Sequence, residues 1–262
     1  MLQAFTSLAF LKGTSSSPLL TVKITAYDDG HAQQQNQEPE HEQQQQQTVD
    51  VLVFPAALQY TSLPLSSLPT VISHHAVDFS TLRQPSPRPP PQLPQPTKVH
   101  DISRKLTLLV CCHGAKDGRC GARGPPLAHT LTSLVKERHL DQVQVLATSH
   151  IGGHQYAGNV VVYCPMHPSD GDWFGGLDAS HANASASDAE EFLGALLEAE
   201  VGVDGGAEDE RLRRWWRGRM GLDGEEQVEL FDSYGYGDQQ IDTIYEEEEE
   251  EEEHYNNNNS DR

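Results

Sequence analysis

The sequence has few cysteines, few basic residues and no long apolar run. Four cysteines in 262 residues are too few for the disulfide scaffold of a small secreted protein. Neither a secretory hydrophobic segment nor 18 consecutive apolar residues occur. We therefore expect a soluble protein in a reducing compartment, where cysteines at motif spacing are more often metal ligands or catalytic groups than disulfides.

Basic residues are outnumbered by acidic ones. The 18 Lys and Arg residues face 39 Asp and Glu residues, and the net charge is -21 at pH 7. This balance repels nucleic acid and anionic membranes, so we expect neither as a partner. Residues 1–27 carry Lys12 and Lys23 but no acid. A transit peptide to the mitochondrion or another organelle is therefore the alternative to a cytoplasmic location.

Hydrophobic residues are also scarce, at 36%. Gln, Pro and Glu are instead concentrated in three blocks, which are residues 28–48, 83–100 and 236–262. Such segments bury too little apolar surface to offset the entropy lost on ordering, so we predict them to be disordered. The predicted organisation is a poorly ordered or truncated region over 1–102 with a strand at 49–55, a folded domain over 103–235, and a disordered acidic tail over 236–262.

The folded domain shows alternating strand and helix patterns. Short apolar runs predict strands over residues 106–110, 143–148 and 159–163, with a fourth beginning at 172. Amphipathic spacing predicts helices over residues 125–140 and 187–199. This order is typical of an α/β domain in which helices flank a small mixed sheet.

Two pairs of metal-ligating side chains follow two of these strands. Cys111 comes directly after the first strand, and Cys120 lies nine positions later in a glycine-rich segment. His150 follows the second strand, and His154 lies four positions later. Because α/β sheets tend to place their sites beyond strand ends, we expect both pairs at one edge of the sheet.

The spacing of these residues favours one cofactor. Thiolate and imidazole ligands suit both iron and zinc, but Cys-x8-Cys is more open than the pair of a structural zinc site. A zincin helix is excluded because Ile151 replaces its glutamate and two glycines follow. A 2Fe-2S cluster needs two separate pairs of ligands. We therefore predict a 2Fe-2S cluster bound by Cys111, Cys120, His150 and His154.

Other interpretations of the cysteines stay open. Cys112 is the rival of Cys111 as a ligand, although it lies on the opposite face of the strand. Cys164 follows the third strand and is expected in the core. The alternative functions are a thiol-disulfide oxidoreductase that uses Cys111 or Cys120, although Cys-x-x-Cys is absent, and a structural zinc module for protein contact.

A basic stretch from Arg211 to Met220 combines five arginines with two tryptophans. Stacking and charge would suit nucleic acid or a partner protein. We favour instead a surface helix whose Leu212, Trp215 and Trp216 pack on the sheet while the guanidinium groups meet nearby acids.

Four segments, in order, resemble the motifs of the sucrase/ferredoxin-like family. They are residues 111–121 (C-x-H-G-x-R-D-x-R-C-G), 149–160 (S-H-x-G-G-H-x-x-A-G-N-V), 171–175 (G-D-W-aromatic-G) and 216–221 (W-R-G-x-M-G). Lys116 stands where the family usually has arginine. The resemblance implies a thioredoxin-like fold and a 2Fe-2S cluster on the four residues named above. It also implies an electron carrier or redox sensor with a protein redox partner. We find no paired carboxylates for glycosidase chemistry.

Overall fold

The computed structural model describes eight segments of the chain, which are residues 27–28, 48–79, 90–149, 151–167, 169–179, 187–199, 209–220 and 228–230. The Gln-rich tract, the acidic tail and residues 83–89 of the Pro-rich segment lie largely outside them, so their disorder stays a prediction. Residues 90–100 are described and include most of a strand over Lys98–Asp101, so the predicted disorder is wrong for that part of the segment. Among the described residues, none of the helices has the length and hydropathy that crossing a bilayer requires.

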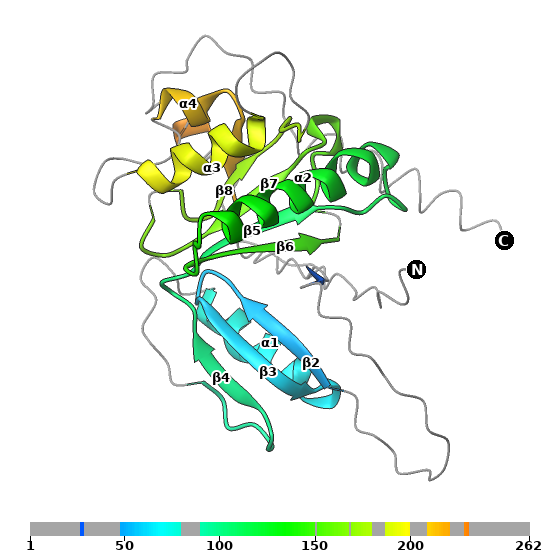
Figure 1. The fold of residues 1–262 in the computed structure, drawn as a ribbon. Helices are drawn as coiled ribbons and strands as arrows, with labels where there is room; N and C mark the ends of the chain where they lie inside the picture. The colour runs from blue at the N-terminus through cyan, green and yellow to red at the C-terminus, as the bar shows by residue number, and fades with distance from the viewer. Residues whose placement is uncertain are drawn as a thin grey trace, which may run out of the picture.

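A six-stranded mixed sheet forms the centre of the larger part of the molecule (Figure 1). Its spatial order is β1 (Tyr27–Asp28), β6 (Val143–Thr148), β5 (Leu106–Cys111), β7 (Val160–Tyr163), β8 (Asp172–Phe174) and β9 (Trp216–Arg219). β5 is parallel to β6 and antiparallel to β7, and the remaining pairs are antiparallel. This confirms the predicted mixed α/β sheet and its thioredoxin-like arrangement.

Two helices cover one face of this sheet. α2 (Gly118–Glu137) connects β5 to β6, as parallel strands require, and α3 (Asp188–Glu198) packs beside it (Figure 1). Ser187 caps α3 by accepting a hydrogen bond from the Glu190 amide. We call the apolar cluster beneath these helices the larger core; it contains Leu108 of β5, Leu131 of α2 and Phe192 of α3.

The opposite face of the sheet carries a second, smaller core. It consists of Cys111, Cys120, Ile151, Ala157, Val161 and Trp173. Alternate residues of β5 contribute to the two cores, since Leu108 and Val110 belong to the larger one and Cys111 to the smaller. The alternation of one strand therefore places a thiol on the face opposite the main apolar core.

A separate three-stranded sheet lies below the six-stranded sheet in Figure 1. It consists of β2 (Thr48–Val53), β3 (Leu58–Pro64) and β4 (Lys98–Asp101). η1 (Leu65–Ser67) and α1 (Leu68–Phe79) follow β3, and α1 packs against the sheet. The sequence predicted a strand at 49–55 in a poorly ordered region. The described residues form more structure because Tyr60, Leu63 and Val71 close a small core between the sheet and the helix.

Two predicted helices differ from those observed. α2 begins at Gly118, so Cys120 lies in its first turn, whereas the prediction began at Pro125. The expected helix over 211–220 is wrong beyond its first turn, because α4 (Glu210–Arg213) ends and β9 follows it. Leu212, Trp215 and Trp216 are buried as predicted.

Candidate functional site

The end of β5 is hydrogen-bonded to both neighbouring strands. Cys111 is the last residue of β5 and pairs with Thr148 of the parallel strand β6. The Cys111 amide donates to the Asn159 carbonyl, and the Cys112 amide donates to the Thr148 carbonyl. The segment after β6, which leads to His154, therefore leaves the same edge of the sheet. His150 lies outside the described residues.

Two thiols face each other at this edge. Cys111 and Cys120 are both fully buried, and both are free of disulfide bonds. Burial, followed by the adjacent Cys111, raises the pKa of Cys120 to about 12. The Cys120 thiol is therefore protonated at neutral pH, so binding of a metal by this sulfur releases a proton.

The other two cysteines lie apart from this pair. Cys112 packs against the larger core, and burial, with a smaller contribution from Cys111, raises its pKa to about 12. Cys164 is buried in the larger core, and its thiol donates to the Ser103 carbonyl at 3.6 Å. The alternation that predicted opposite faces for Cys111 and Cys112 is thus present in the structure.

Glycines allow the first turns of α2 to rest directly on the cysteine segment. A Cβ atom at Gly121 would lie 2.5 Å from the Gly114 Cα atom, and one at Gly124 would lie 2.0 Å from the Cys111 carbonyl oxygen. No real Cβ makes such contacts, so a side chain at either position would push the helix away from the strand. Close backbone packing thus keeps Cys120 against Cys111.

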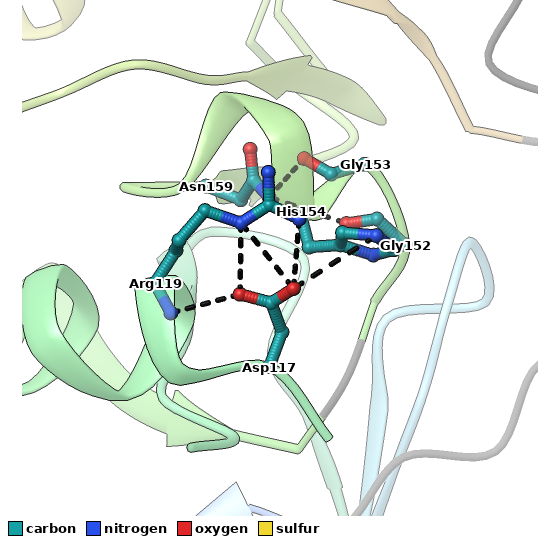
Figure 2. Close-up of polar contacts among 6 residues, drawn as sticks. All are labelled: Asp117, Arg119, Gly152, Gly153, His154 and Asn159. Atoms are coloured by element: carbon teal, nitrogen blue, oxygen red, sulfur yellow. Dashed lines mark hydrogen bonds and ion pairs between the residues drawn. The ribbon is translucent and has the colours of Figure 1, made fainter. Parts of the chain in front are cut away.

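The histidine segment is held by a buried polar contact and an aromatic ring. Asn159, which is fully buried, donates from Nδ2 to the carbonyls of Gly152 and Gly153 at 3.2 and 2.8 Å (Figure 2). Trp173 donates in turn to Asn159 Oδ1 at 3.3 Å. Gly153 has φ +56°, and its Cβ would lie 2.1 Å from the Trp173 ring. The short helix η2 (His154–Tyr156) begins from this turn.

Asp117 joins the cysteine segment to the histidine segment. It caps α2, where its Oδ1 atom accepts from the Arg119 amide at 2.8 Å. Its Oδ2 atom lies 3.9 Å from Nε2 of His154 (Figure 2). The Arg119 side chain bonds both carboxylate oxygens, and these hydrogen bonds hold the pKa of Asp117 well below its usual range. An anionic group therefore lies between the two segments.

Two further cations contact η2. The Arg217 guanidinium lies over the Tyr156 ring, 4.8 Å from its centroid, and Arg123 donates to the Ala157 carbonyl at 3.4 Å. Burial lowers the pKa of Arg217. The turn that carries His154 is thus positioned by a β9 side chain and an α2 side chain.

Three other arginines of the basic stretch form ion pairs with carboxylates. These pairs support the interpretation that the stretch stabilises the fold. Arg211 pairs with Asp209 and Glu198, Arg214 with Glu191, and Arg219 with the buried Asp172. These ion pairs link the last part of the domain to α3 and β8. The predicted meeting of guanidinium groups and acids is confirmed for these three side chains.

The described donors can be compared with the groups that metals require. In the described part of the chain, no three His, Cys, Asp or Glu side chains are arranged to hold a metal ion. The donors gathered at the edge of the sheet are two thiols and the His154 imidazole. Thiolates and imidazoles are ligand types that a 2Fe-2S cluster takes, so the described donors are of the chemical type that such a cluster would need, while His150 lies outside the described residues.

Several residues of this edge were not singled out from the sequence. Asp117, Asn159 and Trp173 all fall within the motifs that resemble the family. A polar residue next to an apolar strand, such as Asn159 before β7, is the signal that could have drawn attention to them. The contacts that they make join segments distant in sequence, which local patterns do not encode.

The fold and these donors define a thioredoxin-like α/β domain with thiol and imidazole groups at one edge of its sheet. The chain matches the sucrase/ferredoxin-like family over residues 4–187, and it belongs to this family. No solved structure matches the chain significantly.

The chain is also similar to fungal proteins named "Altered inheritance of mitochondria protein 32". The protein of Debaryomyces hansenii is 42% identical over 78 residues, which are 30% of this chain and 28% of that protein. The protein of Clavispora lusitaniae is 34% identical over 121 residues, which are 46% of this chain and 41% of that protein. The matched segments thus span less than half the length of these relatives.

Proposed function

We propose that this protein is a 2Fe-2S electron-transfer or redox-sensing protein whose cluster is bound by Cys111, Cys120, His150 and His154. The observation that carries this proposal is the pair of buried, facing thiols at the end of β5, joined through Asp117 to the segment that bears His154. Membership of the sucrase/ferredoxin-like family supports a redox-related role.

The proposed assignment of ligands to the two irons follows from their separation along the sequence, because the cysteines and the histidines belong to different segments. Cys111 and Cys120 hold one iron, and His150 and His154 hold the other. Each iron then takes only two protein ligands, so the site needs no group of three donors around one ion. The tetrahedral structural zinc site of the rival interpretation needs four donors around a single ion.

When bound, a 2Fe-2S cluster supplies one-electron redox chemistry. The residues of this chain bury the thiolates against Trp173 and Val161, away from solvent. Two imidazoles in place of two thiolates remove two negative charges, which favours electron acceptance. In Rieske centres this exchange accompanies potentials of about -150 to +300 mV, against about -400 mV in plant-type ferredoxins.

The cellular setting is inferred from the relatives. Their name refers to the inheritance of mitochondria, and this supports a mitochondrial link for the present chain, with a cytoplasmic location as the alternative. The partner is expected to be another redox protein that exchanges electrons with the cluster.

Metal and sulfide analysis tests the proposal directly. We expect anaerobically purified or reconstituted protein to contain iron and acid-labile sulfide in equal amounts and to give an EPR signal on reduction. Cys111→Ser and Cys120→Ser should lose most of the iron, because each removes a thiolate ligand. The matched controls Cys112→Ser and Cys164→Ser should retain it, because Cys164 lies in the larger core and Cys112 packs against it. Protein that binds zinc and contains no sulfide after reconstitution would overturn the proposal in favour of the structural zinc module.

Thiol-disulfide exchange is the second candidate, because Cys111 and Cys120 face each other. The high pKa of Cys120 opposes it, since a nucleophilic cysteine needs a lowered pKa. Reduction of insulin disulfides that persists after both His150 and His154 are replaced by alanine would favour this candidate over the cluster.

A further inference from the structure

The structure contains the same helix cap twice, at Asp117 and at Asp209. Each aspartate precedes a helix, and its Oδ1 atom accepts from the amide two residues later at 2.8 Å. Each also binds the side chain of that second residue, Arg119 or Arg211, through both carboxylate oxygens. Both caps satisfy an amide of the first helical turn.

The two caps differ in what lies beyond the arginine. At the start of α4, Arg211 extends to the Glu198 carboxylate of α3. At the start of α2, the Oδ2 atom of Asp117 approaches Nε2 of His154 at 3.9 Å. Both side chains are largely buried, with exposed fractions of 16% for Asp117 and 18% for His154. The capping oxygen of Asp117 is Oδ1, whereas Oδ2, which also accepts from Arg119, is the oxygen that faces the imidazole.

The two ring nitrogens of His154 have different surroundings. Nε2 faces the carboxylate, as Figure 2 shows, while Nδ1 is buried. A separation of 3.9 Å is longer than a hydrogen bond, so the contact is electrostatic. Histidines that bind metals commonly direct their second ring nitrogen at a carboxylate, which fixes the tautomer and the ring orientation.

We propose that Asp117 is a positioning residue that orients His154 so that Nδ1 is the ligating nitrogen. This inference rests on the proposed function, because it assigns a ligand atom for the cluster. Arg119 and the α2 cap hold the carboxylate in place through contacts that do not involve the histidine segment. The negative charge beside the imidazole also stabilises the oxidised state, so its removal raises the reduction potential.

Asp117→Asn tests the inference, with Asp209→Asn as the matched control. Asparagine caps helices about as well as aspartate, so both variants should fold, which circular dichroism checks. We expect Asp117→Asn to assemble a cluster with a higher reduction potential and to lose iron to a chelator about ten-fold faster or more. Pulsed EPR of protein labelled with ¹⁵N-histidine should show altered nitrogen couplings. Asp209→Asn should match the wild type in all three measurements.

Asp117→Ser provides a second variant if the asparagine variant folds poorly. Serine keeps a capping oxygen but has no second oxygen to face the imidazole, so it should behave as Asp117→Asn does. Unchanged potential, chelator rate and nitrogen couplings in a folded Asp117 variant would overturn this inference alone. A wild-type protein that assembles no cluster would overturn the proposed function and this inference together.

Discussion

The two faces of the six-stranded sheet bury different kinds of side chain. The larger core collects leucines, valines and aromatic rings from β5, β7, α2 and α3. In the described part of the chain the smaller core has six buried residues, two of which are cysteines, and its Trp173 side chain donates a hydrogen bond to a buried asparagine. β5 contributes to both through alternate residues, so one strand serves an apolar core on one face and a donor site on the other.

This difference indicates that the larger core mainly stabilises the fold, whereas the smaller core mainly positions the proposed ligands. The larger core has apolar contacts that can be removed far from the thiols. The smaller core combines few apolar residues with close backbone contacts, so small changes there alter the relative positions of the ligand segments. Changes on one face should therefore affect unfolding, and changes on the other should affect cofactor retention.

The largest expected effect on stability comes from the larger core. Phe192 is fully buried against Phe174 and Trp215, so Phe192→Ala should lower the free energy of unfolding by about 3–5 kcal/mol. Urea denaturation measures this loss. Leu197→Ala on the same helix is the control. Because Leu197 is exposed, its replacement should lower the free energy of unfolding far less. The comparison fails if the folded Phe192→Ala protein has less iron per chain than the wild type.

A smaller stability loss with a larger effect on the site is expected at Gly124. The alanine Cβ would meet the Cys111 carbonyl, so Gly124→Ala should destabilise the fold by about 1–3 kcal/mol and reduce the iron content. Among the described residues, no atom apart from the nearby backbone of its own helix lies within 4 Å of the corresponding position at Gly194 in α3. Gly194→Ala should therefore stabilise the protein by about 0.5–1 kcal/mol and leave the iron content unchanged. Equal iron in the two variants would contradict the proposed role of close packing.

Among the three substitutions that disturb a core, the smallest loss of stability is expected at Trp173. Trp173→Phe removes the hydrogen bond to Asn159, which should cost about 1 kcal/mol in thermal unfolding. Because Asn159 holds the carbonyls of Gly152 and Gly153, the EPR spectrum of the cluster should broaden as the histidine segment loosens. An EPR spectrum identical to that of the wild type would show that Trp173 packs in the smaller core but does not hold the histidine segment in place.

The strands of the fold could be predicted where their patterns are local. The apolar runs at 106–110 and 143–148 correspond closely to β5 and β6. The start of α2 was missed because Pro125 and Pro126 lie inside it, and proline usually marks the first turn of a helix. β9 was missed because a strand depends on its neighbour, here β8, rather than on its own composition.

The small sheet and the site also depend on long-range contacts, which local sequence patterns do not indicate. β3 pairs with β4 across the Pro-rich segment, and no local pattern indicates such a long-range pairing. At the site, spacing suggested the cysteine pair and alternation separated Cys111 from Cys112. The approach of Asp117 to His154 could not be predicted, because it depends on the parallel register of β5 and β6.

The parallel pairing of β5 with β6 also shows where this chain tolerates redesign. Leu106 and Val143 begin the two strands at one edge of the sheet, whereas Cys111 and Thr148 end them at the other. The turn from Arg138 to Gln142, which connects α2 to β6, therefore lies a full strand length from the thiols. A peptide tag or fluorescent reporter inserted there lengthens the chain between the cysteines and the histidines without changing their separation in space.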